Sequence, residues 1–170
     1  MSRVGVLGAG AWGTALAQML ASDGREVLLW ARELELVTEI NTAHTNSLFL
    51  PSAILADTIR ATGDTAEMAQ CDVLLVVTPA QHLGAVLGTM PAHPRDLVLC
   101  SKGIEAGSGR LMNDVAGDAA PASDIAILSG PTFAHEVAAG LPTAVTLACG
   151  GGRAQWERLS PVIARQAFRP

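Results

Sequence analysis

The chain has 170 residues, of which 49% are hydrophobic, 16% are charged and only 4% are aromatic, with no tyrosine. This length is typical of one domain, whose core must be built from alanine, valine, leucine and isoleucine. The net charge of −5 argues against binding to nucleic acid or to an anionic membrane, because both need a basic surface. No apolar run reaches the roughly 18 residues of a membrane helix, and no signal-peptide pattern precedes the first strand, so we expect a cytoplasmic protein.

The first predicted element is an apolar strand that runs into a cluster of glycines. Residues 4–13 read VGVLGAGAWG, with glycines at 8, 10 and 13 where a helix should begin. This spacing is typical of a dinucleotide-binding fingerprint. Gly8 permits a tight turn, Gly10 lets the backbone approach a pyrophosphate, and Gly13 lets the helix pack close to the strand. The phosphates would lie at the helix N-terminus, where free N–H groups and the helix dipole favour negative charge.

A helix over residues 14–21 and a second strand over residues 26–31 complete a βαβ unit. The residue that follows this strand is Arg32, where an NAD-specific site has a carboxylate for the adenine ribose. A guanidinium can pair with a 2′-phosphate, which favours NADP (NADPH) while leaving NAD possible. Alternatively, Arg32 is a solvated residue that opens a helix together with Glu33 and Glu35.

Apolar strands and helices continue to alternate along the rest of the chain. The predicted strands cover residues 58–62, 72–78, 96–101, 124–128 and 144–149. The predicted helices cover residues 64–70, 81–90, 110–119, 133–139 and 153–165, the last one marked by Trp156, Leu159, Val162 and Ile163 at helical spacing. This alternation predicts an α/β fold with a doubly wound, mostly parallel sheet covered on both faces. Another strand begins within 166–170, so we expect a fragment or an isolated first domain.

Four segments are candidates for the site, because ligands of doubly wound sheets bind beyond the carboxyl ends of the strands. They are 78–81 (TPAQ), 101–105 (SKGIE), 129–134 (SGPTFA) and the connecting loop 46–51 (NSLFLP). Lys102 is the only lysine of the chain, and its position favours a role near the nicotinamide or the substrate. Segment 129–134 opens a helix and offers N–H groups and the Thr132 hydroxyl to an anion. Each segment also has a structural explanation, as a turn, a helix cap, a solvated lysine or a pre-proline connection.

Metal, hydrolase and disulfide chemistry find no support in the sequence. The pair His135-Glu136 lacks the second histidine of a helical zinc site, and the three other histidines are expected to be solvated. Neither a GxSxG elbow nor a GxxxxGK[ST] phosphate loop occurs. The cysteines are odd in number and lie in or beside apolar runs, which predicts buried free thiols at Cys71, Cys100 and Cys149.

Together these segments resemble the N-terminal domain of bacterial-type NAD(P)-dependent glycerol-3-phosphate dehydrogenase. The resemblance covers essentially the whole chain and is carried, in order, by GAGAWGTALA, LLWAR, NSLFLP, VVTPA, SKGIE, SGPTFAHEVAAGLPT and a final FR. It implies a cytoplasmic oxidoreductase that interconverts dihydroxyacetone phosphate and sn-glycerol 3-phosphate, which supplies the backbone of glycerophospholipids. Two other hypotheses are a related two-domain hydroxyacid or sugar-nucleotide dehydrogenase and a module that senses NADP without chemistry.

The resemblance also implies roles for individual residues. Besides the three glycines, the positions that match cofactor-binding residues of the family are Ala11, Trp12, Arg32 and Ala134. Lys102 matches a lysine that meets both cofactor and substrate, and Gly130 and Thr132 match substrate positions. The family's catalytic lysine would lie beyond Pro170 in a helical C-terminal domain, so we expect no catalytic residue here. Residues 1–170 should therefore bind NADPH as one domain without turnover, and a full-length homodimer is compatible with the family.

Overall fold

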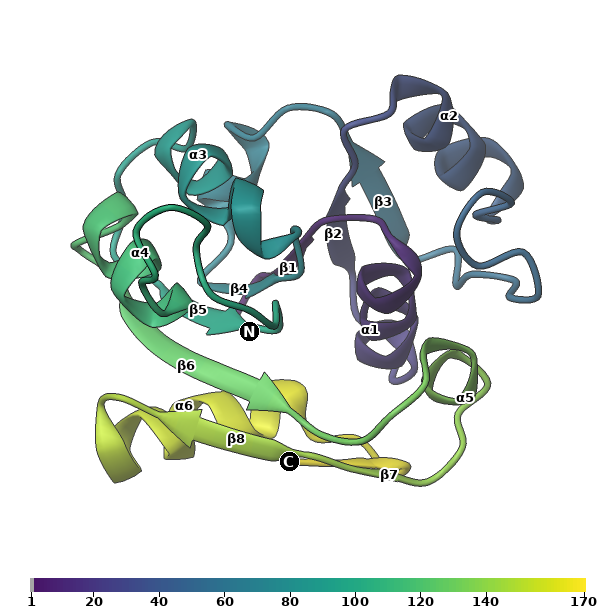
Figure 1. The fold of residues 1–170 in the computed structure, drawn as a ribbon. Coiled ribbons are helices and arrows are strands. Elements are labelled where there is room, and N and C mark those ends of the chain that lie inside the picture. Colours follow the sequence, from purple (N-terminus) through teal and green to yellow (C-terminus); the bar gives the residue numbers. More distant parts are fainter. Residues whose placement is uncertain (1) are drawn as a thin grey trace.

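The computed structural model describes residues 2–170, which form one seven-stranded sheet and a small two-stranded one (Figure 1). The large sheet has the order β3-β2-β1-β4-β5-β6-β8, and all neighbours are parallel except β6 and β8. Its strands are β1 (Val4–Leu7), β2 (Val27–Trp30), β3 (Ile59–Thr62), β4 (Val73–Val76), β5 (Asp96–Leu99), β6 (Asp124–Ser129) and β8 (Thr146–Cys149). The predicted doubly wound, mostly parallel α/β fold is confirmed.

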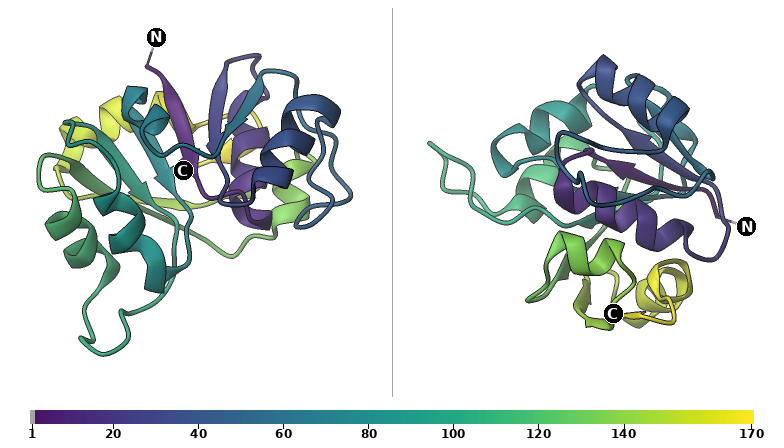
Figure 2. Two further views of the ribbon diagram at one scale, coloured as in Figure 1. Left: turned by 90° about the horizontal axis from the view of Figure 1, so that it is seen from above. Right: turned by 90° about the vertical axis from the view of Figure 1, so that its right-hand side faces the viewer.

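Helices cover both faces of the sheet, which explains why its central strands are continuous apolar runs. Every residue of β1, β4 and β5 is buried, as expected for parallel strands packed on both sides. The helices are α1 (Ala11–Ala21), α2 (Leu34–Ala43), α3 (Leu83–Gly88), α4 (Met112–Ala119), α5 (Ala134–Ala138) and α6 (Gly152–Ile163). Buried residues of α1, α2, α5 and α6 belong to one core cluster, and those of α3 and α4 to another. Figure 2 shows α1, α5 and α6 gathered on one side of the molecule.

Several predicted elements differ in detail from the observed ones. The first helix begins at Ala11 rather than at residue 14, so Gly13 lies within its first turn. The predicted helix 81–90 consists of a 3-10 turn, η2 (Ala80–His82), followed by α3, and the predicted helix 64–70 is the 3-10 turn η1 (Glu67–Gln70). Short 3-10 turns are frequent as connectors and at the N-termini of α-helices, so the predicted positions hold but the type of turn differs.

The predicted strand 144–149 is divided into two elements that pair with different partners. Its first part, β7 (Thr143–Ala144), pairs in parallel with β9 (Phe168–Arg169), whereas β8 pairs antiparallel with β6. The strand expected within 166–170 is therefore present as β9. The predicted helix 153–165 is present as α6, in which Leu159 and Ile163 are buried and Trp156 is 45% exposed.

The first and last parts of the chain are fastened together beside α1. The Arg165 guanidinium donates to the Leu20 carbonyl at 2.8 Å and 3.2 Å, and Arg25 donates to the Val162 carbonyl at 3.1 Å. Arg25 also holds Asp23, and this hydrogen bond lowers the pKa of the Asp23 carboxyl. Phe168 of β9 is 1% exposed and belongs to the same core cluster as α1.

The cysteines are free thiols, as predicted. Cys71 and Cys100 are buried and Cys149 is partly buried. Burial raises the pKa of the Cys71 thiol to about 11 and also raises the pKa of Cys100, so both thiols stay protonated and unreactive near neutral pH. None of the helices within residues 2–170 is long and apolar enough to cross a membrane.

Candidate functional site

A groove of about 700 Å³ opens at the carboxyl ends of β1, β2 and β4. This volume is in the usual range of ligand pockets, roughly 300–1,000 Å³. The position is where the strand order reverses between β1 and β4, which is where open α/β sheets bind ligands. Its lining comes mainly from the segments that follow these strands, namely Gly8, Ala9, Gly10, Arg32, Glu33, Val77, Thr78 and Pro79, with Phe49 from loop 46–51.

The three glycines of the fingerprint meet three different geometric demands. Gly8 has φ +124°, a conformation that side chains rarely adopt, and its N–H donates to the Trp30 carbonyl at 3.1 Å. A Cβ on Gly13 would lie 1.8 Å from the Gly8 oxygen, so only glycine lets α1 approach β1 this closely. A Cβ on Gly10 would meet nothing within 4 Å. Gly10 is therefore not required by packing, and its missing side chain leaves space in the groove.

The N-terminus of α1 faces this space with its backbone donors free of competing groups. Gly10 is the N-cap with φ −66°, and the helix has neither a side-chain cap nor an acidic residue in its first turn. Ala11 and Trp12 provide that turn, and both are partly buried. An uncapped helix start concentrates unsatisfied N–H groups and positive partial charge, which is suited to a phosphate.

A buried hydroxyl beside the glycine turn also fits a polar ligand. Thr78 is 3% exposed, and its backbone nitrogen would lie 3.1 Å from a Cβ on Gly8. Its Oγ1 has no hydrogen-bond partner within residues 2–170. Buried hydroxyls in native structures are usually satisfied, so an unpaired one in a groove is consistent with a donor or acceptor that a ligand supplies.

The Asn46 side chain holds the glycine turn in place through hydrogen bonds, a role that the sequence did not reveal. Its Nδ2 donates to the Ala9 carbonyl at 2.9 Å and to Thr14 Oγ1 at 2.8 Å, and its Oδ1 accepts from the Phe49 N–H at 2.9 Å. The side chain is fully buried. Loop 46–51 is thus fixed against the start of α1, which sets Phe49 into the wall of the groove.

Asn46→Ala should destabilise the protein by about 2 kcal/mol, because the three groups that hydrogen-bond to the Asn46 side chain are buried and would each lose that partner. Urea denaturation followed by circular dichroism measures the change. Asn113→Ala is the matched control: its Nδ2 donates only to the exposed neighbour Asp114, so the expected change is within about 0.5 kcal/mol. Equal stabilities of the two variants would contradict the bracing role.

Arg32 and Glu33 both line the groove and form an ion pair with each other. Arg32 Nη2 lies 3.0 Å from Glu33 Oε1, and the Arg32 side chain is 78% exposed. Glu33 follows Arg32 directly in sequence, and the structure places both side chains in the same wall. The end of the groove at β2 thus offers an exposed cation and a carboxylate together.

The other predicted residues lie along the same edge of the sheet but do not line the groove. Lys102 is exposed in the loop that follows β5. Gly130 follows β6, and its missing Cβ lets it approach Val145, whose Cα would lie 3.1 Å away. Thr132 is partly buried, and Ala134 is the first residue of α5, packed against the core cluster of α1. The close packing against Val145 is therefore sufficient to explain a glycine at position 130, apart from any contact with a substrate.

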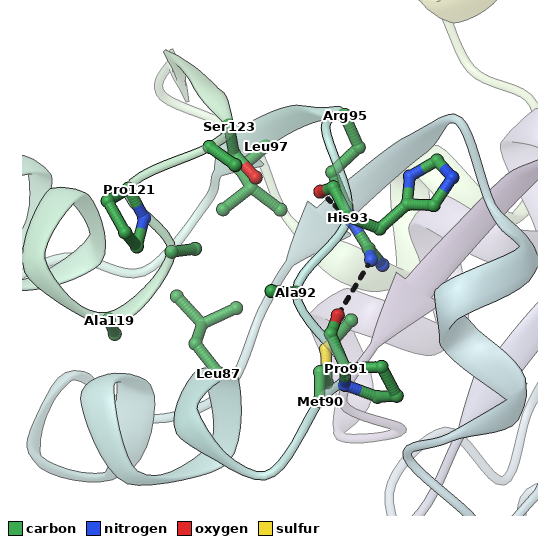
Figure 3. Close-up of a pocket in the computed structure, with 12 residues that line it drawn as sticks. Leu87, Met90, Pro91, Ala92, His93, Arg95, Leu97, Ala119, Pro121 and Ser123 are labelled. Carbon is green, nitrogen blue, oxygen red and sulfur yellow. Dashed lines mark hydrogen bonds between the residues drawn. The ribbon is translucent and has the colours of Figure 1, made fainter.

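A second pocket, of about 80 Å³, lies at the opposite edge of the sheet, where the segments before β5 and β6 meet (Figure 3). Arg95 reaches into it and donates to the carbonyls of Met68, Pro91 and His93. The guanidinium thus ties together the segments that lead into β4 and β5. Within the described residues no group of three metal-binding side chains occurs in either place.

The reversal of strand order, the glycine turn and the uncapped helix above it define a dinucleotide-binding domain of the Rossmann type. Residues 3–154 match the family model described as NAD-dependent glycerol-3-phosphate dehydrogenase N-terminus. The chain belongs to this family, which favours it over the hydroxyacid and sugar-nucleotide dehydrogenases considered from the sequence.

Similar proteins agree with this assignment. Two proteins named glycerol-3-phosphate dehydrogenase [NAD(P)+] are 70% identical (Erythrobacter litoralis) and 71% identical (Novosphingobium aromaticivorans), over 99% and 98% of this chain. The crystal structure of glycerol-3-phosphate dehydrogenase from Coxiella burnetii is 34% identical, with a TM-score of 0.87 over 99% of this chain and 52% of that one. The chain spans about half the length of the curated relatives, 51% and 50%.

Proposed function

We propose that this chain is the cofactor-binding half of a cytoplasmic enzyme that reduces dihydroxyacetone phosphate to sn-glycerol 3-phosphate, the backbone of glycerophospholipids. The observation that carries the proposal is the open position at Gly10 above the uncapped start of α1, in a chain of this family. The acidic composition, with a net charge of −5, supports a small-molecule substrate rather than nucleic acid or a membrane. A homodimer of the full-length enzyme is part of the same proposal.

The chain's residues suit a bound dinucleotide in three places. Gly8 would form the tight turn, Gly10 would leave room for the pyrophosphate, and the first-turn N–H groups of Ala11 and Trp12 would bind its oxygens. Gly13 would hold α1 close enough to present those groups. Arg32 would contact the adenosine ribose, and Ala134 would border the nicotinamide half. When bound, the reduced cofactor supplies the hydride.

We also propose that NADPH is preferred over NADH, with NAD as a possible alternative. Arg32 would exchange its ion pair with Glu33 for the 2′-phosphate, whose greater negative charge makes it the better partner for a guanidinium. The two residues lie in one wall, so Glu33 would compete with the phosphate for Arg32. The preference is then a balance between the two contacts.

Arg32→Asp should shift the preference toward NADH, because the partner of the 2′-phosphate is lost and a repelling carboxylate takes its place. The expected change in discrimination is about 1.5–3 kcal/mol, typical of a charge-assisted hydrogen bond. Titrating NADPH and NADH by fluorescence measures it, and Arg153→Asp, at an exposed position of α6, is the charge-matched control. An unchanged preference would transfer the determinant to Glu33, which Glu33→Gln would then test.

On the substrate side, Lys102, Gly130 and Thr132 would contact dihydroxyacetone phosphate. The Lys102 ammonium would stabilise negative charge on the phosphate or on the oxygen that gains charge as the ketone is reduced. The alkoxide must also gain a proton, and the family resemblance assigns that step to a lysine outside this chain. Residues 1–170 alone should accordingly bind NADPH without measurable reduction of dihydroxyacetone phosphate.

An enzyme that joins residues 1–170 to the C-terminal half of the Erythrobacter litoralis relative tests the whole proposal. It should oxidise NADPH with dihydroxyacetone phosphate, whereas a domain that only senses NADP should bind the cofactor and show no turnover. The 70% identity of the N-terminal halves makes their contacts with the second half transferable. Activity of residues 1–170 alone would overturn the division between the halves.

In this joined enzyme, Lys102→Ala should lower kcat/KM for dihydroxyacetone phosphate roughly 10²-fold, the loss of one positioned charged contact. NADPH binding should weaken much less, because the contacts at the glycine turn and Arg32 remain. Steady-state kinetics and a NADPH titration separate the two effects. Normal kinetics of Lys102→Ala would make this lysine a solvated loop residue.

A further inference from the structure

The Gln81 side chain bridges two loops that lie at neighbouring strand ends. Gln81 is the middle residue of the short turn η2 after β4, and its Nε2 donates to the Ile104 carbonyl at 2.9 Å. Its Oε1 accepts from the Ala106 N–H at 2.7 Å. One amide side chain thus satisfies an acceptor and a donor of the loop that carries Lys102, across 23 and 25 positions of sequence.

The remainder of that loop is folded mostly on itself. Ile104 and Leu111 form an isolated antiparallel bridge, the Glu105 N–H donates to the Arg110 carbonyl at 2.9 Å, and the Gly109 N–H donates to the Glu105 carbonyl at 3.0 Å. This hairpin, residues 104–111, is exposed for most of its length. At its far end Arg110 Nη2 donates to the Asp114 carbonyl at 3.0 Å and to Asp118 Oδ2 at 2.7 Å, both in α4, so the Gln81 bridge fixes the side of the hairpin that is next to Lys102.

Lys102 lies between two attachments to the loop after β4. Before it, Ser101 Oγ donates to the Thr78 carbonyl. After it, Gly103 has φ +139° and approaches Ala80, because a Cβ on Gly103 would lie 3.1 Å from the Ala80 Cβ. The Gln81 bridge follows immediately. The backbone of Lys102 is thus set by the loop whose Thr78 and Pro79 line the groove.

We propose that Gln81 is a positioning residue for Lys102: its bridge holds residues 102–106 so that the ammonium can contact both cofactor and substrate. The proposal rests on the proposed function, in which Lys102 meets both cofactor and substrate. Gln81 itself touches neither. The loop after β4 both lines the groove and carries Gln81. The same loop would therefore contact a bound dinucleotide and hold Lys102 in position.

The chemistry of the bridge defines which side chains can replace glutamine. Alanine provides neither contact, and asparagine is shorter by one methylene, so it cannot reach both backbone groups. Glutamate keeps the acceptor for the Ala106 N–H but places an oxygen against the Ile104 carbonyl, where a donor is needed. The expected order of function is therefore glutamine, then glutamate, then asparagine and alanine.

The single lysine of the chain makes the test direct. Reductive ¹³C-methylation labels Lys102 and the N-terminal amine, and Lys102→Arg identifies the lysine signal by removing it. In the unaltered chain, adding NADP⁺ should shift this signal. In Gln81→Ala the NADPH dissociation constant should change roughly threefold or less, while the NADP⁺-induced shift of Lys102 falls by about half or more, as the populated positions of the loop spread. Hydrogen exchange of the Ala106 amide should accelerate in parallel.

Gln70→Ala is the matched control, since Gln70 is also a glutamine with an exposed side-chain hydrogen bond: its Oε1 accepts from Arg3 Nη1, at the opposite end of the sheet. It should leave the Lys102 response unchanged. A full response in Gln81→Ala would overturn the positioning role. Absence of any response in the unaltered chain, with NADP⁺ bound, would overturn the proposed contact of Lys102 and the positioning role with it.

In the joined enzyme a double-mutant cycle gives an independent measurement. Gln81→Ala should lower kcat/KM for dihydroxyacetone phosphate on the order of tenfold, but should have no further effect when Lys102 is already alanine. Additive losses would show that Gln81 acts on something other than Lys102 and would overturn the proposal.

Discussion

Replacing Gly10 with valine should abolish NADPH binding while the fold survives. The φ of −66° at this position is open to any residue, and a Cβ would meet no atom within 4 Å. The added isopropyl group would instead fill the space in front of the first-turn N–H groups of α1, where we propose that the pyrophosphate binds. Circular dichroism and a fluorescence titration test the two halves of the expectation separately.

Gly88→Val provides the control for this prediction. Gly88 ends α3, and a Cβ there also meets nothing within 4 Å. This variant should fold and bind NADPH as the unaltered chain does. If Gly10→Val instead bound NADPH normally, the pyrophosphate would have to lie elsewhere, and the proposed use of the fingerprint would be wrong.

Gly13→Ala should have the opposite outcome and prevent stable folding. The new Cβ would stand 1.8 Å from the Gly8 carbonyl oxygen, which is backbone and cannot rotate away. Relief requires α1 to move from β1, and this would open the core that α1 shares with β1, β2 and α5. We expect a loss of at least about 4 kcal/mol, at the extreme end of single substitutions. Urea denaturation or the yield of folded protein measures it.

Gly117→Ala is the informative comparison, because Gly117 lies inside α4 and a Cβ would meet only Ile125 Cδ1 at an ordinary 3.7 Å. Alanine is the better helix former by about 1 kcal/mol, so this variant should gain stability. Equal effects of Gly13→Ala and Gly117→Ala on stability would show that the backbone at Gly8 can move away from the new Cβ at little cost, contrary to the expectation.

The sequence predicted the sheet well, because buried parallel strands such as VGVL and VLLV are continuous apolar runs. Such a run can be recognised without knowing which strand it pairs with. The division of residues 143–149 into β7 and β8 at Val145 could not be predicted from the sequence. TAVTLAC mixes apolar and β-branched residues with no turn residue along its length, and only the pairing with β9 and β6 divides it. Trp156 shares the helical spacing of Leu159 and Ile163, but α6 packs mainly against the edge strand β8, so part of that helix face remains open.

For the candidate site, local motifs located the glycine turn and Arg32, since their chemistry is carried by adjacent residues. Contacts between distant segments were beyond such motifs. Asn46 reads as part of a loop, yet it is buried against Ala9, 37 positions away. Gln81 reads as an exposed residue after a proline turn, and its partners lie in another loop. The pairing of Arg32 with Glu33 depends on side-chain direction, which spacing does not give.

The hydrogen bonds between Arg165 and the end of α1 have a consequence for how the protein folds. Arg165 and Leu20 are 145 positions apart, yet their hydrogen bonds join the first helix to the segment before β9. Closing so long a loop is entropically costly and slows folding relative to a chain with local contacts. The face of the sheet that carries α1 can be sealed only after residues 159–168 have left the ribosome. Until then the strands made first expose their apolar side chains, and this early half of the chain is where chaperones should bind.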